Sequence, residues 1–564
     1  MKKLFRVGLP LLLFCLAPLV VSAQSFRVQC PTSTITHPDL NKTGNSSEPA
    51  YTGPTTLSPG TNGFLTPTAN VNGAIKCQQI GGGDGMSTMG DGTQIYMFSF
   101  GPLSGLADIA DGLAGTEFPN VFNTVYPGTF VPGDPATTLG AGAGGAGTAQ
   151  NPVPIAFPYN GAVGLAPDVD AIANGNCVAP CLDGHVDPRA IIDVGVMNGN
   201  IPAPLLAMDE DDEVFFTLTN VGMIMRPDLF EQHTVHFHGY PNASSFYDGV
   251  PDASVAINIG GSFTYYYLAP DAGTCFWHCH ITPPEHLQMG MVGQLYVRPR
   301  QDRVPTGGDL YTYLGYQQND LRTKCDSNAD ILCSNPLPAV NTGVTNPAAV
   351  YNAATSGTNG PRPGYGYNDG DGSTYYDVEY PIQIHGFDPS FHFVGMTFNP
   401  EQFNDMKDKY FLLNGRSYPD TVTPGPLATQ ATDGKMHFSQ PLPSIISIPA
   451  GGRALLRISD LDVTEYQTLA SLGIPMTVIG FNAKLLRDQA GNNLYYTTNS
   501  ITLGGGESLD VILDTCTDPD RASHPTTCTA PLATGTYYLY TPNLDHLSND
   551  AENFGGLMTE VHIN

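Results

Sequence analysis

The sequence is poor in basic residues, in tryptophan and in long apolar runs. Its 564 residues contain 23 Lys and Arg against 52 Asp and Glu, which gives a formal net charge of −29, and they contain a single Trp. Nucleic-acid binding needs a basic footprint, so this balance argues against a nucleic-acid partner. An acidic surface keeps an exported protein soluble, and it also attracts metal cations or basic partners.

Only the start of the chain has the pattern of a targeting segment. A basic beginning is followed by an apolar run at 7–21 and then by Ser22-Ala23-Gln24. These features are typical of a secretory signal peptide, here residues 1–23. The apolar run is too short to span a bilayer comfortably, and no later stretch has a transmembrane pattern. We therefore expect an exported protein, periplasmic, cell-surface or extracellular, without a membrane span.

Extended helical periodicity is scarce, whereas Gly (63) and Pro (48) are abundant. Short runs of β-type residues are separated by turn residues along the whole chain. Strands are expected at Gln94–Phe100, Glu213–Thr219, Ser262–Leu268, Gly293–Val297, Arg453–Ile458, Ser508–Leu513 and Thr536–Tyr540. The pattern predicts an all-β protein made of sandwiches or barrels.

The length predicts more than one domain, because a mature chain of about 540 residues exceeds what one core usually serves. We expect an irregular N-terminal extension at 24–88, a first barrel at 89–300 with an insertion at about 103–185, a linker or excursion at 301–374, and a second β domain at 375–564. The first barrel is expected to open with a strand near Ile95–Phe100.

Ten of the eleven cysteines lie beyond the signal peptide. Eight of them form four pairs that are plausible disulfides in an oxidising compartment: Cys30–Cys77, Cys177–Cys181, Cys325–Cys333 and Cys516–Cys528. Cys275 and Cys279 are left over. Metal ligation would explain why a cysteine stays out of a disulfide there. We expect Cys275, which shares a strand face with Cys279, to be a buried thiol rather than a ligand.

Six of the fourteen histidines fall within 54 residues, in two groups. The groups read His233-x-x-His236-x-His238 and His278-Cys279-His280-(x5)-His286-(x4)-Met291. In a strand, residues i and i+2 share one face while i+1 points to the other. A strand that carries His-Cys-His can therefore serve two metal sites, one on each side.

On the cysteine side, the residues offer a thiolate, two imidazoles and a thioether. Two His and one Cys with a weak axial Met form the ligand set of type 1 (blue) copper. We therefore predict a type 1 copper on His233, Cys279, His286 and Met291. The alternatives are a zinc site or histidines that are merely satisfied in a core, but zinc has no use for a Met five residues past the last His.

On the other side, His236, His238, His278 and His280 form a second candidate site. Four imidazoles from two strands could hold a copper pair or half of a larger cluster. A vacant relic of such a cluster is the alternative reading of the same residues.

The motifs resemble the first domain of a multicopper oxidase. They are Val196–Pro204, His236-Phe-His-Gly239, Tyr247-Asp-Gly249, Gly273–His280 and Met289–Val297. A weaker likeness, at Phe411–Asp420, is to the opening of another cupredoxin domain. The resemblance implies two cupredoxin-like Greek-key β-barrels with type 1 copper in the first.

The resemblance also implies a reaction. Electrons pass singly from a substrate to type 1 copper, then through Cys279 and its neighbours His278 and His280 to a trinuclear cluster of type 2 and type 3 copper. That cluster reduces dioxygen to water. His236 and His238 would complete half of its ligand set. Asp248 matches an acidic position of the family, although it is equally a turn residue before a glycine.

The chain departs from the family pattern in its ligand count. The family uses four His-x-His pairs, and this chain has two. The second domain should supply the others near 469–478, which contains no histidine, and near 538–546, which contains only His546. His385 and His392 are expected to be ordinary surface or turn residues. The loop Pro283-Pro284-Glu285 adds two residues before His286 and is similar to that of bacterial members linked to manganese oxidation.

Three arrangements are compatible with the missing ligands. A homo-oligomer could join two half-sites across a subunit interface. A single type 2 copper could use His238 and His278 with a donor such as His546 from a neighbouring second domain, similar to copper nitrite reductase. Alternatively, only the type 1 site is filled.

Two functional hypotheses follow. The first is an exported copper oxidoreductase that takes electrons from a phenol, a metal ion or a redox protein and passes them to dioxygen. The second is a non-catalytic type 1 copper protein for electron transfer or copper handling. Retention of His236 and His280 favours the first hypothesis, because a pure electron carrier does not need them. Glu231 and Glu285 are the carboxylates nearest in sequence to His233 and His286, as a metal-ion substrate would require.

Overall fold

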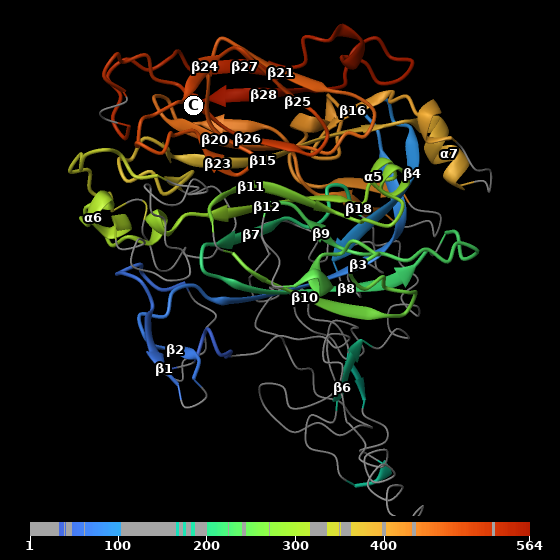
Figure 1. Cartoon of the computed structure of the whole chain (residues 1–564). Helices are drawn as coiled ribbons and strands as arrows, with labels where there is room; N and C mark the ends of the chain where they lie inside the picture. The colour runs from blue at the N-terminus through green and yellow to red at the C-terminus, as the bar shows by residue number, and fades with distance from the viewer. Residues whose placement is uncertain are drawn as a thin grey trace, which may run out of the picture.

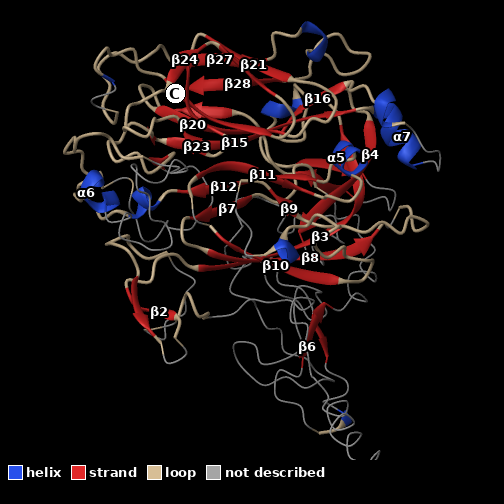
Figure 2. Ribbon diagram, in the orientation of Figure 1, coloured by secondary structure: helices blue, strands red, loops and turns tan. Residues whose placement is uncertain are grey.

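The computed structural model consists of β-strands with few and short helices, as the sequence pattern predicts (Figure 2). It describes residues 33–38, 40, 48–60, 63–102, 165–167, 173–175, 182–186, 200–223, 225–239, 244–269, 271–315, 336–348, 350, 363–396, 402–430, 436–521 and 525–564. No helix in these ranges is both long and apolar enough to cross a membrane. The signal peptide and most of the insertion at 103–185 lie outside the described residues.

The first barrel is formed by two four-stranded sheets, in the orders β10-β8-β3-β4 and β7-β12-β11-β9. Their strands are β3 (Ile75–Thr88), β4 (Gln94–Pro102), β7 (Leu206–Asp209), β8 (Glu213–Gly222), β9 (His236–Phe237), β10 (Ser262–Leu268), β11 (Gly273–His278) and β12 (Val292–Arg298). Aromatic and branched side chains alternate toward the space between the sheets, so Phe216, Trp277 and Leu295 are fully buried in one cluster. Outside the barrel, β1 (Thr56–Pro59) pairs with β2 (Leu65–Ala69), and β5 (Leu165–Pro167) with β6 (Leu182–Val186).

Strand β3 corrects one expectation, because it lies within the extension at 24–88 that we expected to be irregular. It pairs in parallel with β8 and antiparallel with β4, so the barrel opens with it rather than with β4. The glycines of β3 concealed the strand, since glycine weakens strand interiors. At Gly82 a Cβ atom would lie 2.8 Å from the ring of His233, so the missing side chain leaves room for that histidine.

The second barrel packs a seven-stranded sheet, β16-β15-β20-β26-β22-β23 with β24 on β22, against a five-stranded sheet, β19-β28-β27-β21-β25. The strands are β15 (Val378–Phe387), β16 (Tyr410–Leu413), β19 (Ile446–Ile448), β20 (Arg453–Asp460), β21 (Gln467–Leu472), β22 (Met476–Phe481), β23 (Lys484–Leu485), β24 (Tyr496–Thr498), β25 (Ser500–Leu503), β26 (Glu507–Asp514), β27 (Gly535–Tyr540) and β28 (Met558–Ile563). Leu456, Val478 and Val511 are fully buried between the two sheets. Small sheets pair β13 (Gly364–Tyr365) with β14 (Tyr375–Tyr376) and β17 (Leu427–Gln430) with β18 (Met436–Gln440). The described residues include the α-helices α5 (Pro283–Gln288), α6 (Leu310–Gly315) and α7 (Pro389–Met396).

The two barrels are stacked so that β11 and β12 of the first lie beside β15 and β20 of the second (Figure 1). Buried apolar side chains fill part of this interface, including Phe276 and Phe387. Elsewhere in this interface, the carboxylate of Glu379 accepts hydrogen bonds from Arg298, at 2.8 Å, and from Arg457, at 3.0 Å. Removal of one partner from such a buried ion pair is strongly destabilising, so these groups fix the barrels relative to one another.

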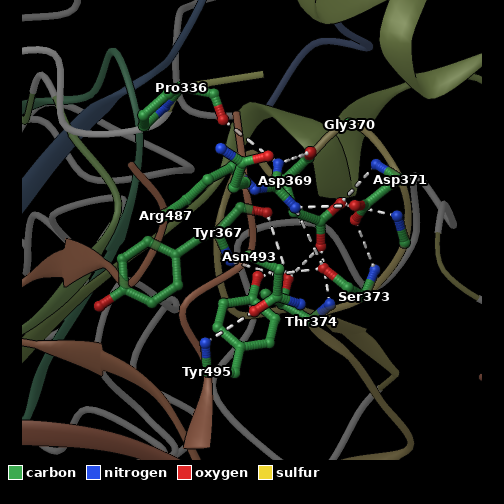
Figure 3. Close-up of polar contacts among 12 residues, drawn as sticks. Pro336, Tyr367, Asp369, Gly370, Asp371, Ser373, Thr374, Arg487, Asn493 and Tyr495 are labelled. Atoms are coloured by element: carbon green, nitrogen blue, oxygen red, sulfur yellow. Dashed lines mark hydrogen bonds and ion pairs between the residues drawn. The ribbon is translucent and has the colours of Figure 1, made fainter. Parts of the chain in front are cut away.

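Within the segment at 301–374, which we expected to be a linker or excursion, the loop around Asp369 and Asp371 is anchored to the second barrel by Arg487 (Figure 3). The guanidinium of Arg487 donates to the carbonyl oxygens of Pro336 and Asp369 and, at 2.7 Å, to the carboxylate of Asp371. Asp369 in turn accepts hydrogen bonds from the backbone N–H groups of its own loop, including that of Thr374 at 2.8 Å. The loop is therefore held by its own side chains, by Arg487 and by Arg453, which donates to the Ser373 carbonyl oxygen at 3.1 Å.

The cysteines can be compared with the expected pairs only in part. Cys516 and Cys528 form a disulfide with a Cα–Cα distance of 5.9 Å, which confirms that prediction. The other three expected pairs involve side chains outside the described part of the chain. Cys275 and Cys279 are buried and are not joined to each other.

Candidate metal centre

Strand β11 carries the residues that connect the two predicted metal clusters. It pairs with β12 on one side and with β9 on the other, and His278 lies directly opposite His236. Cys279 follows the last residue of the strand. Its side chain points away from the His278 side, as the alternation of strand residues predicts.

The first cluster is formed by His233, Cys279 and His286. His233 comes from a segment bridged to Ile257, and His286 comes from α5. The Nδ1 atom of His286 lies 3.3 Å from the Cys279 sulfur, and the Nδ1 atom of His233 lies 4.0 Å from it. All three side chains are fully buried. Three donor atoms within 4.8 Å of one another can bind one metal ion.

Met291 lies beside this cluster. It is fully buried, and its carbonyl oxygen accepts a hydrogen bond from the Cys279 N–H at 3.2 Å. Its own N–H donates to the carbonyl oxygen of His286 at 2.8 Å. The N–H of Thr234 points at the Cys279 sulfur from 3.4 Å and stabilises a negative charge there.

The electrostatics of the first cluster favour a thiolate. Burial raises the pKa of the Cys279 thiol, but His286 and His233 outweigh it and hold that pKa well below its ordinary value. Burial lowers the pKa of the His286 imidazole, whereas the Cys279 thiolate and the Glu231 carboxylate raise it to about 10. The Nε2 atom of His286 lies 3.5 Å from that carboxylate.

These residues fit a copper ion. Both Nδ1 atoms point at one sulfur, and the buried Nε2 atom of His233 has no hydrogen-bond partner among the described residues. A soft thiolate with two imidazoles is the donor set that copper prefers, and the buried Met291 is joined to Cys279 and His286 by backbone hydrogen bonds.

The second cluster is formed by His236, His238 and His278, whose ligand nitrogens lie within 4.8 Å of one another. The Nε2 atoms of His238 and His278 are 3.1 Å apart. The Nδ1 atom of His278 donates to the Cys279 carbonyl oxygen at 2.8 Å, and that of His236 donates to the Asp248 carbonyl oxygen at 2.6 Å. A carbonyl oxygen only accepts, so these contacts place the ring protons on Nδ1 and leave both Nε2 lone pairs for a metal.

Burial keeps two of these rings neutral. Burial, together with the neighbouring imidazoles, lowers the pKa of His278 to about 3 and that of His238 to about 4. Neutral imidazole is the metal-binding form. The ring of His280 completes the group, with its centroid 5.0 Å from that of His236.

A pocket of about 660 Å³ opens beside the second cluster, between the barrels. His238 and His278 line one side, and the segments Leu461–Tyr466 and Gly504–Glu507 line the other. The second barrel therefore presents these two segments to the histidines, in place of the segments 469–478 and 538–546 in which further ligands were sought. They supply carboxylates, including Glu465 and Glu507, and no imidazole.

His546 does not join the cluster. Its Nδ1 atom lies 2.9 Å from the Gln467 side-chain oxygen, and its Nε2 atom lies 3.1 Å from the Glu465 carboxylate. Its ring stacks on Phe411 with centroids 3.9 Å apart. His546 is thus fully engaged within its own barrel.

Our expectation that His385 and His392 are surface or turn residues is wrong. Each is 1% exposed, at the interface of the two barrels beside α5. His392 contacts the backbone of Gln288, two residues after His286. No spacing pattern connects residues more than 100 positions apart, so only the fold reveals this contact.

Comparison with known proteins gives a partial match. Residues 184–302 match the family model described as multicopper oxidase. "Laccase 1" of Metarhizium majus is 32% identical over 127 residues, which cover 22% of this chain and 19% of that protein. "Multicopper oxidase MCE" of Talaromyces pinophilus is 34% identical over 131 residues, covering 23% and 20%. The chain spans about a fifth of the length of these relatives.

Among solved structures, the blue copper oxidase of Nitrosomonas europaea is similar with a TM-score of 0.40 and 21% identity, over 65% of this chain and 78% of that one. The multicopper oxidase mgLAC has a TM-score of 0.43 and 14% identity, over 87% of each chain. The family match itself covers the residues that build both clusters. Residues 184–302, which include both clusters, are therefore a segment similar to the multicopper oxidase (cupredoxin) family.

Proposed function

We propose that the chain is an exported copper-dependent oxidoreductase of the multicopper oxidase type. Electrons enter at the first cluster and leave through the second to dioxygen. The donor is a phenol, a metal ion or a redox protein. The observation that carries the proposal is the shared position of the clusters on one strand end, where Cys279 belongs to the first and His278 to the second.

The residues would hold the cofactor in two places. His233, Cys279, His286 and Met291 would hold type 1 copper, and His236, His238, His278 and His280 would hold the second copper. Bound there, copper would supply one-electron oxidation at the first place and reduction of dioxygen at the second. Three imidazoles gather within one chain, so a single ion at the second place needs no donor from the second barrel.

The chain itself provides a short connection between the clusters. Cys279 is joined to His278 and to His280 by single peptide bonds. A hydrogen bond of 2.8 Å also links the Cys279 carbonyl oxygen to His278 Nδ1. Both routes run through bonded or hydrogen-bonded atoms.

The entry side lies at His286. Its Nε2 atom faces Glu231, whose side chain is 29% exposed, so this carboxylate connects the buried ring to solvent. Burial raises the pKa of Glu285. The neighbouring Glu231 carboxylate raises this pKa further, while His286 lowers it. Two carboxylates beside the ring can accept a phenolic proton or attract a cationic donor.

A cycle of reduction and reoxidation, followed by visible absorption, tests the proposal. Copper-loaded protein should lose its blue absorption when a reduced donor is added without oxygen, and it should regain the absorption when oxygen is admitted, with oxygen uptake. Catechol, Fe(II) and Mn(II) should be compared as donors. Bleaching without recovery of the absorption and without oxygen uptake would contradict the proposal. It would favour a non-catalytic electron-transfer protein instead.

A further inference from the structure

Helix α5, which carries His286, is only six residues long. A helix of this length has little stability of its own, so tertiary contacts decide where it lies. Figures 1 and 2 show α5 next to α7 and β4 at one edge of the molecule. Helix α7 belongs to the second barrel, which contributes no side chain to the first cluster among the described residues.

The ring of His392, from α7, lies between α5 and β4. Its Nε2 atom is 2.9 Å from the carbonyl oxygen of Gln288, and its Nδ1 atom is 2.5 Å from that of Tyr96. Phe387 packs on the ring, with centroids 4.3 Å apart. One imidazole of the second barrel therefore links the end of α5 to a strand of the first.

The side chain of Gln288 is held by the second barrel as well. Its amide nitrogen donates to Asp408 at 2.9 Å, and its amide oxygen accepts from the N–H of Asp388 at 2.8 Å. Gln288 is fully buried, and Asp388 and Asp408 are 4% and 7% exposed. Both ends of a buried amide are thus satisfied, a state that is costly to disturb.

We propose that His392 and Gln288 act as positioning residues for the first copper site, so that the second barrel sets its geometry. Gln288 follows His286 by two residues and precedes Met291 by three, so the His392–Gln288 contact restrains the chain that carries both ligands. This inference rests on the proposed type 1 copper. The inference goes beyond the proposed function because it gives the second barrel, which lacks histidine pairs, a role in tuning that copper. Partners that orient metal ligands affect metal affinity and electronic properties.

The test uses the copper-loaded full chain with His392→Phe, which keeps a ring but removes the imidazole nitrogens that contact the carbonyl oxygens of Gln288 and Tyr96. We expect a changed ratio of the charge-transfer bands, a changed copper hyperfine coupling in electron paramagnetic resonance and a shifted reduction potential. Copper should bind about tenfold more weakly, the lower end of the effect for such partners. His392→Gln keeps a donor and should restore part of each property. His562→Phe is the matched control, because His562 lies on β28 and its side chain is 31% exposed.

Gln288→Leu provides a second route if His392→Phe does not fold. It removes the amide contacts and should shift the same spectroscopic properties in the same direction. A blue wild type whose folded variants keep the wild-type spectrum and potential would overturn the inference alone. A copper-loaded wild type without blue absorption would overturn the proposed function, and the inference with it.

Discussion

At the scale of single residues, Cys279 belongs to both clusters. Its sulfur lies 3.3 Å from His286 in the first cluster, and its carbonyl oxygen lies 2.8 Å from His278 in the second. The His-Cys-His spacing predicts this arrangement because alternate strand residues point to opposite faces. By contrast, the contact of Glu231 with His286 depends on how α5 folds back, which the sequence does not indicate.

We predict that Cys279→Ser abolishes the blue absorption completely, because a hydroxyl cannot replace the thiolate as a donor to copper. Visible absorption and far-ultraviolet circular dichroism of the copper-loaded protein measure colour and fold together. Cys275→Ser is the control, since Cys275 is also buried in this strand, four residues away, and should keep the colour. A blue Cys279→Ser protein would remove the basis for the first cluster.

We predict that His280→Ala keeps the blue absorption but loses oxygen uptake. The ring of His280 lies 5.0 Å from that of His236 in the second cluster, whereas the first cluster lies on the other side of the strand. Absorption spectra and an oxygen electrode measure the two properties separately. Unchanged oxygen uptake would mean that the second cluster is not catalytic.

At the scale of elements, β-type patterning located most strands, and two elements show why it fails elsewhere. All seven expected strands are present, including β10 with its bounds unchanged. Strand β3 was missed because it is rich in glycine. Helix α5 was read as a loop because it begins with two prolines, although proline is well tolerated in the first turn of a helix.

The pairing of β11 with β12 gives an element-scale prediction. Gly293 lies opposite Trp277, and a Cβ atom there would come within 2.4 Å of the indole ring. We expect Gly293→Ala to lower the free energy of unfolding by about 1–3 kcal/mol, as overpacking of cores does. Urea unfolding measures the loss. Gly315→Ala is the control, because a Cβ atom there meets nothing within 4 Å, and an equal loss in both variants would contradict the packing argument.

At the scale of the whole molecule, the N-terminal segment at 33–38 is fastened to the first barrel through Glu213. The carboxylate lies 2.9 Å from His37 Nδ1 and accepts hydrogen bonds from Thr34 and Thr36. Burial raises its pKa, but these partners outweigh burial and lower the pKa from 4.5 to about 2. The contacts join residues more than 170 positions apart, so no local pattern could predict them.

This shift predicts an acid sensitivity. A carboxylate with a depressed pKa stabilises the fold fully above pH 4.5, and the contribution is lost as the pH falls toward 2. We expect Glu213→Gln to cost about 3 kcal/mol or less at pH 7 and nothing near pH 2. Urea unfolding of wild type and variant across this range isolates the one carboxylate, with the exposed Glu552→Gln as control. A cost that does not change with pH would contradict the account.

The central claim is that one β-barrel binds two separate redox metals back to back. The most direct test is copper analysis of the purified, copper-loaded chain, combined with electron paramagnetic resonance and visible spectroscopy on the same sample. We predict more than one copper per chain, with a type 1 signal and blue absorption accompanied by a second, spectroscopically distinct copper. A single copper per chain, or copper without the type 1 signal, would contradict the claim.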